Sequence, residues 1–150
     1  MSDRKLDVLK WGEESGYELH KILDNDTIAG AALNGHLEVV KYLRKHSVSW
    51  DSRTCSNAAK NGHLELLKWC RANQCPWDEW TFRKAAENGH SVLKKWARAN
   101  QCPWDKLTCS QAAAGGHLEV LQWARANQCP WDVWTCTNEN THTDCIIDCR

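Results

Sequence analysis

The amino-acid sequence predicts an all-α solenoid built from stacked helix-turn-helix repeats. Gly-His pairs recur every 27 residues, at positions 35–36, 62–63, 89–90 and 116–117. Tryptophans keep the same step at positions 50, 77, 104 and 131, and aspartates keep it from position 24 to position 132. Self-similarity at a fixed period of this size is typical of repeat architectures, in which neighbouring units bury each other's apolar faces.

Residues 51–77 show how one unit is built. Asp51 is a good N-cap for a first helix of about two and a half turns, and Gly62 can take the left-handed conformation after it. The stretch HLELLKWCRAN then has leucines at helical spacing, and Asn73 is expected to end this second helix in the left-handed conformation. Pro76 prevents the helix from continuing, and no segment shows the alternation of a strand.

The units predict a single repeat domain over residues 1–150. Residues 1–23 form an N-terminal capping half-repeat, because LDVLKW at 6–11 echoes LEVVKY at 37–42. Four full repeats follow at 24–50, 51–77, 78–104 and 105–131, and residues 132–150 form a degenerate C-terminal repeat without the usual alanine pair. Ile146 and Ile147 are expected to be poorly covered, so either another molecule covers that end or the chain belongs to a longer array.

The octet RANQCPWD occurs three times without change, beginning at positions 71, 98 and 125. We interpret it as a joint in which Cys75 fills space, Trp77 seals the seam between neighbouring repeats and Asp78 caps the next helix. Equivalent cysteines of successive repeats are expected to be free thiols, since packed helices lie roughly 8–10 Å apart and a disulfide needs Cα atoms within about 7 Å. Phe82 stands where other repeats have Cys55 and Cys109, which indicates a requirement for apolar volume.

The third full repeat departs from the pattern, because Lys94 stands at a leucine position. A lysine buried without a partner is unfavourable, so we expect either that its stem reaches outward or that the helix rotates locally. The second helix of this repeat is predicted to be the weakest.

Composition and charge restrict the function. The 19 basic and 19 acidic side chains balance, so no net field draws the chain to nucleic acid or to an anionic membrane. No window approaches 18 continuous apolar residues and the first residues are charged, which predicts neither a membrane span nor a secretory signal. We therefore expect an intracellular, cytoplasmic protein whose nine cysteines are free thiols, with no cofactor and no small-molecule substrate.

Three stretches carry a family resemblance. AALNGHLEVVKYL at 31–43, AAKNGHLELLKWC at 58–70 and AAAGGHLEVLQWA at 112–124 resemble the ankyrin pattern A-A-x-x-G-H-x-x-V-V-x-x-L. An ankyrin unit has about 33 residues and opens T-P-L-H, whereas this shorter, tryptophan-rich unit opens Thr-Cys-Ser or Thr-Phe-Arg. The missing residues fall where ankyrins build a β-hairpin finger, so the resemblance implies the helix pairs with the finger reduced or absent.

Metal and catalytic interpretations find less support. Single histidines one repeat apart cannot converge on one ion, and they are expected to hydrogen-bond the turn backbone instead. The best zinc candidate is the set Cys136, His142, Cys145 and Cys149, although it contains no C-x-x-C and His142 aligns with the Gly-His histidines. No catalytic motif is present, so we predict that the protein is not an enzyme.

Positions that vary between repeats predict where a partner binds. In ankyrins the first helices and fingers line the concave face, so the resemblance implies a protein partner on that face and a role as an interaction scaffold or adaptor. Two alternatives stay open: a structural subunit of a larger assembly, and a zinc- or thiol-dependent regulatory module that uses the cysteine-rich tail. The predicted partner-binding residues are Arg53, Asn57, Trp80, Arg83, Lys84, Leu107, Gln111, Trp134 and Asn138.

Overall fold

The computed structural model describes residues 2–130, and the predicted all-α repeat fold is confirmed there. These residues form ten helices and no strand. Contacts divide the chain into two compact units, Met1–Pro76 and Trp77–Arg150, and each is described by itself. The division into a capping half-repeat, four full repeats and a degenerate repeat stays a prediction.

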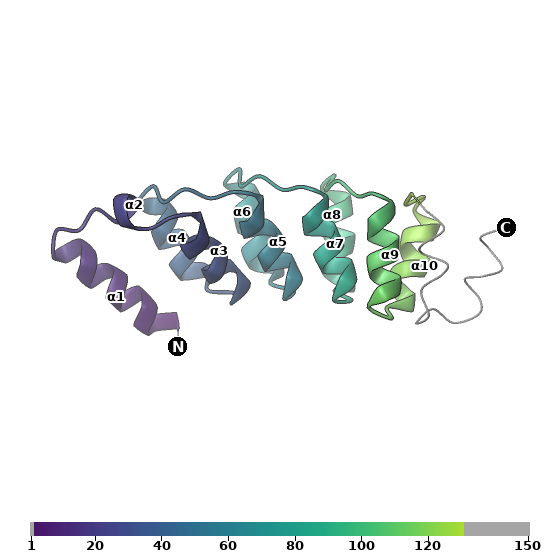
Figure 1. The fold of residues 1–150 in the computed structure, drawn as a ribbon, viewed down its shortest axis with the longest axis horizontal. Coiled ribbons are helices and arrows are strands. Elements are labelled where there is room, and N and C mark those ends of the chain that lie inside the picture. The colour runs from purple at the N-terminus through teal and green to yellow at the C-terminus, as the bar shows by residue number, and fades with distance from the viewer. Residues whose placement is uncertain (1, 131–150) are drawn as a thin grey trace. The chain divides into compact units, whose positions relative to one another are not determined.

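The first unit contains six helices, drawn from purple to teal in Figure 1. They are α1 (Ser2–Glu14), α2 (Leu19–Ile22), α3 (Asn25–Leu33), α4 (Leu37–Lys45), α5 (Ser52–Lys60) and α6 (Leu64–Ala72). The pairs α3–α4 and α5–α6 are antiparallel hairpins, and the first helices α3 and α5 pack directly against each other. Helix α1 packs on α4, so it continues the row of second helices.

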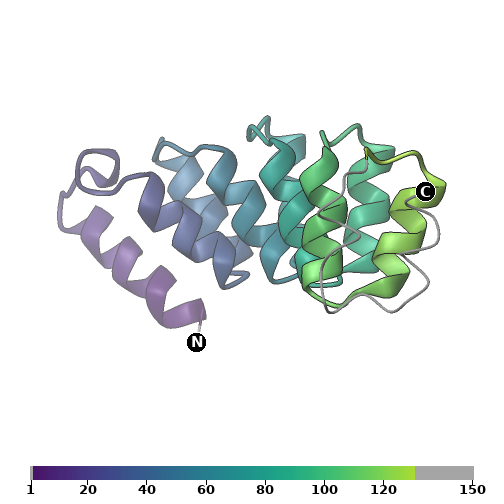
Figure 2. The same cartoon turned by 45° about the vertical axis from the view of Figure 1, so that its right-hand side comes forward.

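The second unit repeats this arrangement with α7 (Glu79–Glu87), α8 (Ser91–Ala99), α9 (Lys106–Ala114) and α10 (Leu118–Ala126). Helix α7 packs on α9, while α8 and α10 each pack on the first helix of their own pair. Figure 2 shows the same pairs from another side. Both units therefore have a layer of first helices and a layer of second helices, with the core between the layers.

The predicted aspartate caps are confirmed at all four first helices. The side chain of Asp24 accepts hydrogen bonds from the backbone N–H groups of α3, and Asp51, Asp78 and Asp105 do the same for α5, α7 and α9. Asp105 adds a capping box with Thr108. Each cap satisfies amide groups that the first turn of a helix leaves without a partner.

The end of the second helix differs from the prediction. Asn73 keeps a φ of −103°, and Gln74 is the residue that adopts the left-handed conformation, with a φ of 65°. The Asn73 amide Nδ2 donates to the carbonyl of Trp69 at 2.8 Å, which keeps Asn73 on the helix. The N–H groups of Gln74 and Cys75 then donate to the carbonyls of Arg71 and Cys70, as in a Schellman motif. The prediction for Gly62 is confirmed, since its φ is 75°.

The structure shows neither of the two arrangements predicted for Lys94. Its side chain is only 1% exposed, and it occupies the same helical register as the buried Leu67 of α6 and Leu121 of α10. The stem does not reach outward and α8 has not rotated, so both alternatives are wrong. Instead, the ammonium Nζ lies 5.0 Å from the centroid of the Trp123 ring, an arrangement that partly compensates the buried charge.

Candidate partner-binding surface

The tryptophan of the repeated octet joins neighbouring repeats, as predicted. Trp50, which stands at the equivalent position before the first octet, lies after α4, and its ring centroid is 5.9 Å from that of Trp69 on α6. Trp104 lies after α8, 6.0 Å from Trp123 on α10 and 5.4 Å from Phe82 on α7. Edge-to-face contacts of this kind stabilise aromatic pairs beyond the area they bury. The octet is therefore a structural joint.

An arginine completes each joint, and the sequence analysis missed its role. The guanidinium of Arg44 lies 4.3 Å from the Trp50 ring centroid and donates to the carbonyl of Val48 at 2.7 Å. Arg98 lies 4.0 Å from Trp104 and donates to Cys102 at 3.1 Å. A planar cation can stack on an indole and donate sideways at the same time. The constant six-residue interval from arginine to tryptophan was the signal available in the sequence.

The six cysteines of the described residues are all buried thiols, and they fill space. Cys75 has no exposed surface, and Val48 occupies the equivalent buried position one repeat earlier. Hydrogen bonds with Cys70 and Cys75, together with burial, raise the pKa of the Cys55 thiol. A hydrogen bond with Cys109 and burial likewise raise the pKa of Cys129. Thiols buried away from solvent are inert, so these cysteines are structural.

Replacing Cys75 with valine is therefore expected to change the free energy of unfolding by less than about 1 kcal/mol, because the site already accepts a valine at position 48. Cys75→Asp is the contrasting variant, and it should destabilise the protein by several times that amount, since it buries an unpaired charge. Urea denaturation followed by circular dichroism measures both. A valine variant as damaged as the aspartate variant would show that the thiol itself is required.

The Gly-His histidines have the structural role that was predicted for them. The Nε2 atom of His63 lies 3.1 Å from the carbonyl oxygen of Leu33, one repeat earlier. Its ring also covers Gly35, where an added Cβ would lie 2.6 Å from the imidazole, and His117 covers Gly89 in the same way. Each glycine thus provides both a left-handed turn and room for the histidine of the next repeat.

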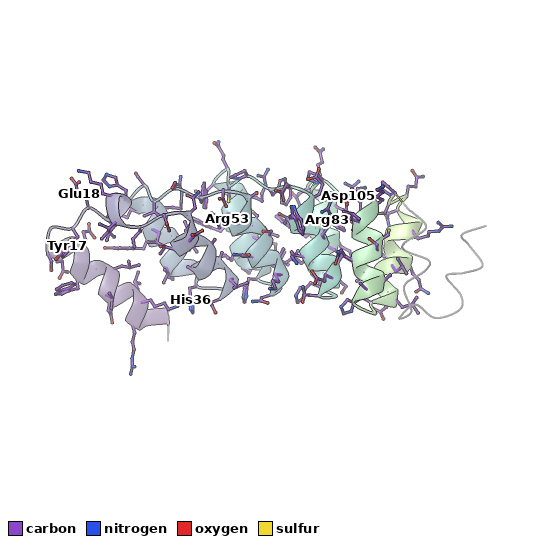
Figure 3. All side chains as sticks on the ribbon, viewed as in Figure 1. Tyr17, Glu18, His36, Arg53, Arg83 and Asp105 are labelled. Atoms are coloured by element: carbon purple, nitrogen blue, oxygen red, sulfur yellow. The ribbon has the colours of Figure 1, made fainter. Side chains whose placement is uncertain are left out.

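Two predicted binding residues of the first unit hold its own first helices together. Arg53 forms ion pairs with Asp26 at 2.6 Å and with Asp51 at 2.9 Å (Figure 3). Asn57 donates from Nδ2 to the carbonyl of Ala29 on α3 at 3.0 Å. Both side chains bridge α3 and α5, although Arg53 remains exposed.

In the second unit, five predicted residues come together on the packed helices α7 and α9. Trp80 is 52% exposed, and the charged ends of Arg83 and Lys84 lie 4.9 Å and 5.8 Å from its ring centroid. On α9, Leu107 is 38% exposed and Gln111 is half-buried. We call the five residues Trp80, Arg83, Lys84, Leu107 and Gln111 the α7–α9 surface.

The cations of the α7–α9 surface already have acidic partners within the chain. Arg83 makes a two-pronged ion pair with Asp105, which lowers the pKa of that carboxyl and raises the pKa of the guanidinium (Figure 3). Lys84 pairs with Glu87 at 2.8 Å. The sequence analysis assigned Asp105 only as a helix cap, because the contact with Arg83 spans 22 residues. The predicted residues Trp134 and Asn138 lie outside the described residues.

Comparison with known families agrees with this geometry. Residues 29–69, which span most of α3 and continue into α6, match the family model of ankyrin repeats in many copies. Residues 29–69 therefore belong to the ankyrin-repeat family. No curated protein matches it. Ankyrin repeats are in general protein–protein interaction modules, and ankyrin-repeat proteins are typically binding scaffolds without enzymatic activity.

Neither a metal site nor a membrane span is found in the described part of the chain. Within residues 2–130, no group of three or more His, Cys, Asp or Glu side chains is arranged to hold a metal ion. The zinc candidate of Cys136, His142, Cys145 and Cys149 lies outside these residues. The described helices include none with the length and apolar character needed to cross a bilayer.

Proposed function

We propose that this ankyrin-repeat protein is a scaffold or adaptor, without catalytic activity, that holds a partner protein on the α7–α9 surface. The observation that carries the proposal is the exposed indole of Trp80. The fold does not require a tryptophan there, since the equivalent positions hold Arg53 and Leu107. Tryptophan is among the residues that most often dominate the binding energy of protein interfaces.

The surroundings of Trp80 suit an interface. Arg83 and Lys84 approach its ring on α7, which restricts the motion of the indole before a partner arrives. Leu107 adds an exposed apolar side chain one repeat away on α9, so a partner can cover both residues at once. The part-exposed ion pair of Lys84 with Glu87 lies beside them and can exchange for an acidic group of the partner.

Trp11 on α1 offers a matched control for the test, because it is 62% exposed and lies on the other unit. Tagged full-length chain, Trp80→Ala and Trp11→Ala would each be used to isolate partners from the native cell, with quantitative mass spectrometry. A partner that binds the parent chain should be recovered at least tenfold less with Trp80→Ala, since loss of an interface tryptophan typically costs about 2 kcal/mol or more.

Recovery with Trp11→Ala should equal that of the parent chain. If every partner binds Trp80→Ala as well as the parent, the α7–α9 surface is not the binding site. The affinity of each recovered partner for both variants would then be measured with purified proteins.

A further inference from the structure

We propose that the groove between α1 and α3 binds residues 132–141 of a second copy of this chain, so that copies associate head to tail. The groove has a volume of about 590 Å³. Its α1 wall includes Arg4, Lys5, Val8 and Leu9, and its α3 wall includes Gly30 and Ala31. Val8 is 66% exposed.

The α3 wall presents the face that a first helix uses to pack on the first helix before it. On α5, this face carries Asn57 and Asn61, which donate to the α3 carbonyls of Ala29 and Leu33 at 3.0 Å and 2.8 Å. The residues one repeat earlier on α3 are Gly30 and Asn34, and both line the groove. The α3 wall therefore presents the same helix positions that α5 uses to pack on α3, so another first helix can pack there.

The α1 wall presents the face that a second helix turns toward its own first helix. The sequence LDVLKW of α1 matches LEVVKY of α4, where Val39 and Val40 are buried. In α1 the matching residues are Val8, which is exposed, and Leu9, which is half-buried. The two walls are thus both complementary to one first helix of the repeat.

Gly30 supports the approach of another helix. Glycine inside a helix costs roughly 1 kcal/mol relative to alanine, and here neither the backbone nor the packing requires it. Its φ is not positive, and an added Cβ would meet nothing within 4 Å. A second backbone that comes close to this open helix face in the complex explains why the residue is a glycine.

Residues 132–141 carry the pattern of a first helix. Asp132, Thr135 and Cys136 stand at the positions of Asp51, Thr54 and Cys55, although the alanine pair of the other repeats is missing. The contact joins different surfaces of the two copies, so it can extend into open chains or close into rings.

Charge favours the same pairing. Residues 132–141 contain two carboxylates, Asp132 and Glu139, and no lysine or arginine, whereas the groove carries Arg4 and Lys5. Asp26 also lines the groove, but Arg53 pairs with it at 2.6 Å. The segment and the groove are therefore electrostatically complementary.

Sedimentation velocity of the full chain tests the proposal between about 10 μM and about 1 mM, a range that detects weak association. The parent chain should sediment faster as its concentration rises. Val8→Asp, which places a charge in the groove, and Cys136→Asp, which places one on the segment, should each stay monomeric. Mixed in equal amounts, these two variants should form a complex of two chains and nothing larger, because each keeps the half that the other has lost.

Matched controls separate the groove from general effects. Val92→Asp changes another exposed valine, 68% exposed on α8, and should associate like the parent chain, as should Cys149→Asp. Gly30→Leu adds a side chain whose Cβ meets nothing within 4 Å, so it should fold normally and block association. A parent chain that stays monomeric throughout overturns the proposal. So does association of Cys136→Asp at the parent level, or a mixture of the two variants that forms no complex.

Discussion

Replacing Trp104 with alanine is expected to lower the free energy of unfolding of the second unit by about 3 kcal/mol. The indole contacts Phe82 on α7 and Trp123 on α10, and the guanidinium of Arg98 stacks on it. It also packs against the two buried clusters that contain Cys102 and Cys109. Alanine removes all of these contacts and leaves a cavity at the seam between two repeats, where a repeat protein derives much of its stability.

Urea denaturation followed by circular dichroism would measure this loss without depending on tryptophan fluorescence. Hydrogen exchange would localise it, with the largest decrease in protection expected in α9 and α10. Trp80→Ala is the control, since it removes a tryptophan that is 52% exposed and should change stability by less than about 1 kcal/mol. Equal losses in the two variants would contradict the role assigned to the octet.

Replacing Lys94 with leucine is expected to raise the free energy of unfolding at pH 7 by about 2–3 kcal/mol. Leucine already occupies the equivalent buried positions 67 and 121, so its volume fits. Burial lowers the pKa of Lys94 from 10.5 to about 8, and the charge of Lys95 lowers it further while Glu119 opposes this. The folded protein at neutral pH therefore carries the cost of a buried ammonium that lies close to the Trp123 ring.

The sign of the pH dependence follows from this lowered pKa. Below about pH 8 both the folded and the unfolded chain are protonated at Lys94, and the full cost is present. Between about pH 8 and 10.5 the unfolded chain binds the extra proton, so stability rises with pH and the cost disappears. The advantage of Lys94→Leu over the parent chain should shrink across this interval.

Urea denaturation of both proteins at several pH values measures the difference in their free energies of unfolding. The titration of other groups affects both proteins equally and cancels in this difference. Lys95→Leu, at an exposed neighbouring lysine, should leave stability within about 0.5 kcal/mol of the parent. A stability advantage of Lys94→Leu that stays constant from pH 7 to 10.5 would show that the ammonium does not carry the cost.

Part of the candidate site could be predicted from the sequence, and part of it depends on the tertiary structure. The variable positions of the repeats identified Trp80 and Leu107, because variation within one chain is visible in the sequence. Their exposure, the ion pair that Arg83 makes with Asp105 and the contact of Arg53 with Asp26 depend on residues of neighbouring helices. Sequence periodicity locates a face, but it does not say which charges on that face are already paired.

The sequence by itself determined the repeat, the helix pairs, the aspartate caps and the glycine turns of this protein. These features depend on residues close together in the chain, such as Asp51 and the amide of Arg53, so local chemistry is sufficient to predict them. Only the tertiary structure decided that Lys94 stays buried over Trp123, that Arg44 and Arg98 complete the joints, and that α1 and α3 enclose a groove. These outcomes depend on packing between helices distant in sequence, where a favourable contact such as the Trp123 ring can hold a residue that its local pattern would exclude.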